Sequence, residues 1–196
     1  MKTPHINRIA TTGPFGLWQG MDGSQVGADL EQLRPFWFRP AGVPQPHPGI
    51  CGYCLAIAPR AGLSLIETLG YSIKTDACGT ELRSAFKAME AELTATYGDH
   101  GLTDGRRDGR PACTAPAWLQ AMRSGEQQLS AQWSAEEGSP LVHGLASVTL
   151  EAQVGRSPAY PGGHLAMKFV FLNHAAATAE IASWRIVEDE DDDEDC

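Results

Sequence analysis

The alternating stretches Ser147-Val-Thr-Leu-Glu-Ala-Gln-Val154 and Leu165-Ala-Met-Lys-Phe-Val-Phe171 decide the fold class of this chain. In each stretch an apolar residue recurs at every second position, as on a strand with one buried face and one wetter face. Residues 129–134 (Leu-Ser-Ala-Gln-Trp-Ser) repeat the pattern upstream. Together these stretches predict three strands of an antiparallel meander.

The first half of the chain adds further strands and the clearest helix signal. Residues 53–57 and 63–69 predict a hairpin with a turn over 59–62, and residues 71–75 predict a third short strand. Residues 80–97 predict a helix, because their apolar side chains fall at steps of four, three, four and four and form one stripe. The stripe consists of Leu82, Phe86, Met89, Leu93 and Tyr97. Gly98 follows at the position where a left-handed residue closes a helix.

The remaining segments predict shorter elements. We expect a short strand over 13–21, a helix from Ser24 to Leu33, a loop over 99–114, a short helix over 115–122 and a final helix over 173–187. Hairpin-length connections favour an antiparallel sheet, or sheets, packed against a few helices over a doubly wound parallel sheet. The predicted fold class is therefore α+β, in a single domain over 1–187.

The negative charge of the chain is concentrated at its C-terminal end. Residues 188–195 (Glu-Asp-Glu-Asp-Asp-Asp-Glu-Asp) are eight consecutive acids. Subtracting them from the 24 acidic side chains leaves 16 against 15 basic ones, so the domain itself is close to neutral. We expect residues 188–196 to form a disordered acidic tail. It would act as an electrostatic arm toward a basic partner, or else only keep the chain soluble.

Composition also narrows the compartment and the partner class. No run of 18 apolar residues is present and residues 1–12 are polar and mixed, so a cytoplasmic location is expected, with no membrane partner. The cysteine count of five is odd, which favours reduced thiols over a disulfide framework. The basic run at 106–110 is interrupted by an acid and the chain is acidic overall, so no nucleic-acid partner is expected.

One group of residues has metal-ligand spacing. Cys51 and Cys54 form a Cys-x-x-Cys pair, with His47 upstream and Cys78 downstream, which gives four candidate zinc ligands. The segment that holds the pair reads as a strand, where positions three apart point to opposite faces. We therefore predict no metal and no cofactor. Whether the four side chains converge remains open from sequence alone.

No nucleophile elbow and no phosphate-binding glycine loop occurs in the sequence, so no catalytic residue is predicted. The recognition residues are sought instead among aromatic and acidic side chains. Phe36-Trp37-Phe38 reads as a short edge strand with Trp37 on the face opposite its neighbours, and Trp18 and Trp118 are further candidates for exposed aromatics. The predicted partner-binding residues are Phe36, Trp37, Phe38, Glu188, Asp189, Glu190, Asp191, Asp192, Asp193, Glu194 and Asp195.

Two stretches carry a resemblance. Gly13-Pro-Phe-Gly-Leu-Trp-Gln-Gly-Met21 and Ile73-Lys-Thr-Asp-Ala-Cys-Gly-Thr-Glu-Leu-Arg-Ser-Ala-Phe86, running on to residue 98, resemble small uncharacterised bacterial proteins of immunity or inhibitor type. The resemblance covers about half the chain and transfers no site residues. It implies a protein that blocks a toxin, nuclease or other effector by occlusion. The alternatives are a hydrolase or transferase with a site assembled from distant loops, around His47 and His100, and a zinc-stabilised structural subunit.

Overall fold

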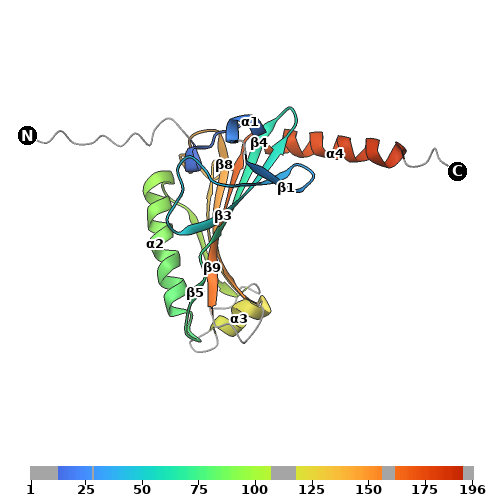
Figure 1. Cartoon of the computed structure of the whole chain (residues 1–196). Helices are drawn as coiled ribbons and strands as arrows, with labels where there is room; N and C mark the ends of the chain where they lie inside the picture. The colour runs from blue at the N-terminus through green and yellow to red at the C-terminus, as the bar shows by residue number, and fades with distance from the viewer. Residues whose placement is uncertain (1–12, 28, 107–117, 156–161, 192–196) are drawn as a thin grey trace, which may run out of the picture.

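A single antiparallel sheet organises the chain, and all nine of its strands lie among the residues that the structure describes. The computed structural model describes residues 13–27, 29–106, 118–155 and 162–191 (Figure 1). The elements are η1 (Pro14–Gly16), α1 (Gly23–Val26), β1 (Leu30–Arg34), β2 (Trp37–Pro40), β3 (Ile50–Ala58), β4 (Gly62–Gly70), β5 (Ile73–Lys74), α2 (Thr80–Tyr97), β6 (Gly101–Arg106), α3 (Trp118–Ser124), β7 (Gln127–Ser134), β8 (Leu145–Val154), β9 (Gly162–Phe171) and α4 (His174–Asp191).

The strand order joins the two halves of the chain at the centre of the sheet. It runs β1-β2-β3-β4-β9-β8-β7-β6, and the short β5 pairs with the start of β9. The central pair β4 and β9 brings Ile66 opposite Phe169 and Glu67 opposite Lys168, residues about a hundred positions apart. The predicted antiparallel α+β fold is confirmed, including the meander of β7, β8 and β9.

One face of the sheet is covered by α2, which spans the predicted residues. Its stripe Leu82, Phe86, Met89, Leu93 and Tyr97 is buried against the inward side chains of β8 and β9. At the helix end, the indole N–H of Trp133 on β7 donates to the backbone oxygen of Gly98 at 2.9 Å. We call this side of the sheet the covered face.

The other helices lie at the two ends of the sheet. Figure 1 shows the sheet nearly edge-on, with α2 along one side, α3 at one end, and α4 running away from the opposite end on the side that α2 does not occupy. Contacts of α4 within the fold are to β3 and β4, and those of α3 are to β7 and β8. The described helices therefore leave much of the sheet face opposite α2 uncovered.

Two N-terminal predictions were wrong. Residues 14–16 form the 3-10 turn η1 rather than a strand, and Phe15 has a positive φ of 59° that no strand allows. The expected helix from Ser24 to Leu33 stops at Val26, because Gly27 has a φ of 149°, and the chain continues as β1. The cap of α1 is Asp22, whose side chain accepts from the backbone of Gln25 in a capping box.

The segment 99–114 was predicted as a loop, but its described part contains β6. This strand pairs with β7 from Gly101↔Gln132 to Arg106↔Gln127 and forms one edge of the sheet. Gly, Asp and Arg are poor strand formers, so pairing with β7 outweighs the local preference. Among the described helices, none is both long and apolar enough to cross a membrane.

Candidate functional site

The aromatic run 36–38 does not form the predicted edge strand. Phe36 has a φ of 65° and lies with Pro35 in the turn between β1 and β2, so the expected alternation begins only at Trp37. Strand β2 is also internal, since β1 pairs with its outer side. All three aromatic side chains are half-buried. Trp37 lies under the guanidinium of Arg34, whose central carbon is 4.3 Å from the ring centroid.

The other two aromatic candidates, Trp18 and Trp118, differ in their exposure to solvent. Trp18 is 44% exposed, whereas Trp118 is 1% exposed and packs at the start of α2. A side chain added at Gly79 would meet the Trp118 ring, so this indole belongs to the core. The prediction that Trp118 is an exposed interface residue was therefore wrong.

Cross-strand rows of side chains define the face of the sheet opposite α2. Residues that pair directly in antiparallel strands point to the same face, so the register can be followed from strand to strand. One row runs from β6 to β3 through Thr103, Ser130, Glu151, Ala166, Leu69 and Gly52. The next row runs through Gly101, Gln132, Thr149, Lys168, Glu67 and Cys54. We call these two rows the open face.

The open face is polar and irregular rather than apolar. All twelve positions of the two rows are exposed or half-exposed, and Leu69, at 48%, is its one large aliphatic side chain. Two hollows of about 230 and 270 Å³ flank β4 and share Glu67, Thr68 and Leu69 as lining residues. A surface of this kind suits a partner that forms hydrogen bonds and fills shallow hollows.

The charges of the open face are nearly balanced. Lys168 Nζ lies 4.0 Å from the carboxylate of Glu67 on the neighbouring strand. Glu151 accepts a hydrogen bond of 3.0 Å from the side-chain amide of Gln153. The strong negative charge of the protein is therefore not on these two rows. It lies at the C-terminal end of α4 and beyond.

Polar contacts fix the start of α4 to the turn between β3 and β4. The carboxylate of Glu180 accepts from the backbone N–H groups of Arg60 at 2.8 Å and Ala61 at 3.0 Å. The side-chain amide of Asn173 donates to the backbone oxygen of Ala61 at 2.7 Å. These bonds hold the first turns of α4 against the β3–β4 turn. They therefore fix the direction in which the helix leaves the sheet.

The end of α4 differs from the sequence prediction in two ways. The helix continues to Asp191, four residues past the end predicted at Val187. Residues 192–196 lie outside the described residues. Ile181 and Trp184 were expected to anchor this helix. Ile181 is half-buried, but Trp184 is 46% exposed and so does not anchor the helix.

The four candidate zinc ligands do not form a metal site. Within the described ranges, which include all four, no group of three or more His, Cys, Asp or Glu side chains can hold a metal ion. Cys51 donates to the backbone oxygens of Leu69 and Gly70 at 3.3 and 3.4 Å, whereas Cys54 lies on the open face. Burial raises the pKa of the Cys54 thiol, so it is a poor thiolate ligand or nucleophile.

His47 and His100 do not share a site either. His47 Nε2 lies 3.3 Å from a carboxylate oxygen of Glu92, and His100 Nε2 lies 3.0 Å from Glu90. The two glutamates are two residues apart on α2, and such positions point about 200° apart around a helix. The His100 ring also packs edge-on against Trp133, with centroids 4.7 Å apart.

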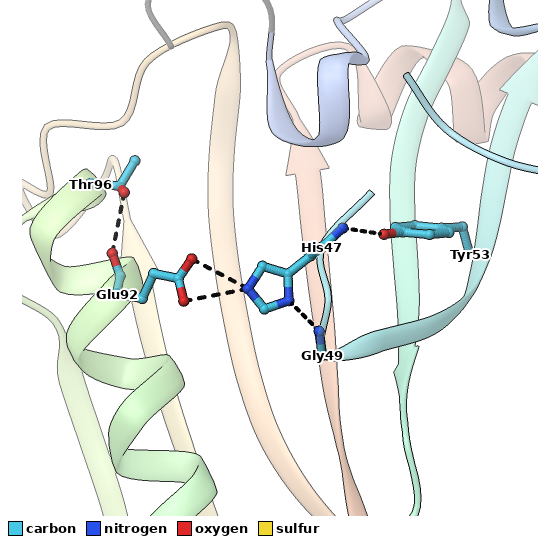
Figure 2. A network of polar contacts seen from close by, with 5 residues as sticks. All are labelled: His47, Gly49, Tyr53, Glu92 and Thr96. Carbon is cyan, nitrogen blue, oxygen red and sulfur yellow. Dashed lines mark hydrogen bonds and ion pairs between the residues drawn. The ribbon is translucent and has the colours of Figure 1, made fainter. Parts of the chain in front are cut away.

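Three polar contacts hold the His47 group on the covered side of the sheet (Figure 2). The Gly49 N–H donates to Nδ1 of the imidazole at 3.0 Å, and the His47 N–H donates to the hydroxyl of Tyr53, also at 3.0 Å. Since Nδ1 is an acceptor, the proton of the neutral ring lies on Nε2 and points to Glu92. Both ring nitrogens are thus engaged, which leaves neither free as a general base.

Comparisons with known proteins identified no relative of this chain. A scan against protein-family models, a search of curated proteins and a search of solved structures each found no match.

Proposed function

We propose that this protein acts by binding another protein across its open face, as an inhibitor or immunity-type protein that blocks a toxin, nuclease or other effector. The observation that carries the proposal is the pair of continuous side-chain rows across six strands of one sheet, which no described helix covers. An antiparallel sheet commonly packs one face against the core and leaves the other face in contact with water. Here that other face spans six strands and is hollowed on both sides of β4.

The acidic end of the chain supports a basic partner. Helix α4 leaves the fold on the side of the open face, and its last residues begin the run of eight acids (Figure 1). A partner seated on the open face would have this charge at its flank. Charge at the rim of an interface raises the association rate more than the affinity, and salt weakens the effect.

Affinity capture followed by titration tests this proposal. The full chain is used to capture partners from the organism that encodes it, and each partner is then purified and titrated against three variants. Thr149→Arg places a long cation in the middle of the open face, and we expect it to weaken binding by about a hundredfold. A chain ending at Val187 should bind with a slower association rate that no longer depends on salt.

A matched variant separates occlusion from damage to the fold. Ala91→Arg adds the same side chain at an exposed position on the solvent side of α2, far around the molecule from the open face. It should bind like the unmodified chain. If Thr149→Arg also binds normally while its melting temperature is unchanged, the open face is not the interface and the proposal is wrong.

A further inference from the structure

Another hollow lies on the covered side of the sheet, between α2 and the ends of β4 and β5. Its volume is about 310 Å³, at the lower end of the usual range of ligand pockets. Ala85, Ala88 and Met89 of α2 form one wall, and Ile73 and Leu165 form the opposite one. Because this pocket faces the α2 side, it is independent of the open face and of the proposed function.

Small residues create the space. Alanine at 85 and 88 leaves α2 without bulk where the helix crosses the strand ends. Gly70 lies so close to β9 that an added Cβ would be 2.7 Å from the backbone oxygen of Leu165. At Gly49 an added Cβ would lie 3.2 Å from atoms of the His47 ring. The glycine at 49 therefore lets the imidazole lie against the backbone at the rim of the pocket.

The polar end of the pocket is the carboxylate of Glu92, which lies beside the His47 ring. His47 Nε2 is 3.3 and 3.4 Å from the two oxygens of Glu92, and its other nitrogen is held by Gly49 (Figure 2). These bonds to Glu92 are long, and the Glu92 side chain is 61% exposed, so its oxygens can accept further donors. Tyr71, 58% exposed, contributes an aromatic side chain to the same lining.

We propose that this pocket binds a small organic cation: an ammonium group on a compact apolar body. The ammonium pairs with the Glu92 carboxylate beside Tyr71, because a carboxylate and an aromatic face both attract a positive charge. The apolar body fills the space between Ala88, Ile73 and Leu165. The described lining contains the Glu92 carboxylate and no Lys or Arg, so it favours a cation over an anion.

Phenethylamine and phenethyl alcohol are matched probes, since they differ only in the group that would face Glu92. Titrations of the full chain are followed by the amide NMR signals of the pocket. We expect phenethylamine to shift the signals of Gly49 and Ala88 and to bind about tenfold or more tightly than the alcohol. Butylamine and hexylamine, tested in parallel, should bind at the same signals.

Variants on α2 assign the effect to the pocket. Glu92→Gln keeps the shape of the carboxylate but removes its charge, and should lower amine affinity about tenfold while leaving alcohol affinity unchanged. Ala88→Leu should abolish binding of both probes by filling the space. Glu90→Gln, which changes the glutamate paired with His100, and Thr149→Arg on the open face should leave amine binding unaltered.

Several results would overturn the inference. They are equal binding of amine and alcohol, unchanged amine affinity in Glu92→Gln, signal shifts that map away from 49 and 88, or no shift with any of the three amines. The melting temperature of each variant is recorded, and Glu92→Gln is compared with Glu90→Gln so that a general loss of stability is not mistaken for loss of a ligand contact. Loss of partner binding in Thr149→Arg has no bearing on this test.

Discussion

The two faces of one sheet differ in burial and in polarity. On the covered face, Leu150, Met167 and Phe169 are at most 2% exposed and pack under α2. On the open face, their neighbours along the same strands, Thr149 and Lys168, remain accessible to water. Since alternate residues of a strand point to opposite sides, the same strands carry both surfaces. The apolar core packed under α2 therefore lies on one face, and the surface we propose for recognition lies on the other.

Because of this division, mutations can change the stability of the sheet and its proposed binding of a partner separately. A core face is closely packed, so a lost methylene group is felt throughout its neighbours. A solvated face tolerates most substitutions within a fraction of a kcal/mol. Substitutions on the covered face should thus change the free energy of unfolding, and substitutions on the open face should change binding.

The largest effect is expected for Phe86→Ala in the middle of α2. The ring is 1% exposed, and its loss should lower the free energy of unfolding by about 3–5 kcal/mol. Thr149→Ala on the open face should lower it by less than about 1 kcal/mol. Urea denaturation of both variants measures the difference. Equal losses would show that the open face is as tightly packed as the covered one.

A smaller but still large effect is expected for Gly79→Ala at the start of α2. Gly79 has a φ of 70°, and an added Cβ would lie 2.2 Å from carbons of the Trp118 ring. The left-handed backbone and the displaced ring together should lower the free energy of unfolding by about 2–4 kcal/mol. Thermal unfolding checks this, and Gly125→Ala, with a φ of 75° but no atom within 4 Å, separates the backbone cost from the clash.

The sequence predicted the covered face far better than the open one. The stripe of α2 and the alternation of β7, β8 and β9 both record burial, and burial is what periodicity reports. Strand β6, by contrast, is held by pairing with β7, and its Gly, Thr and Asp residues show no apolar period. The turn at Phe36 was missed because a positive φ is unusual for an aromatic residue.

The candidate surfaces were harder to predict for a related reason. The open face is assembled from residues of six strands that are polar or small, so no single segment marks it. The pocket beside Glu92 depends on where α2 crosses the sheet, which is a property of the tertiary fold. The sequence marked His47 only as a candidate zinc ligand or catalytic residue, and nothing in it pairs His47 with Glu92.

The free energy of unfolding should depend on pH through His174, the first residue of α4. Burial, and then the charge of Lys168, lowers the pKa of His174 from 6.5. The unfolded chain therefore takes up this proton first as the pH falls, so stability present above pH 6.5 is lost as the pH passes through the folded pKa. In His174→Gln, stability should decline less between about pH 7 and pH 5. Urea midpoints are measured across that range for both chains, and coinciding curves would contradict the prediction. His164, whose pKa is lowered by burial, contributes to the slope that remains in the variant.

The smallest effect is expected for the ion pair on the open face itself. Lys168 Nζ is 4.0 Å from Glu67, and both side chains are nearly half-exposed. Water and salt screen such a pair, so Lys168→Met should change the free energy of unfolding by at most about 1 kcal/mol. The same variant removes a cation from the middle of the open face, so it should speed association with a basic partner. A double-mutant cycle with Glu67→Gln measures the pair directly, and a coupling well above 1 kcal/mol would mean that these charges hold the sheet together rather than remain available to a partner.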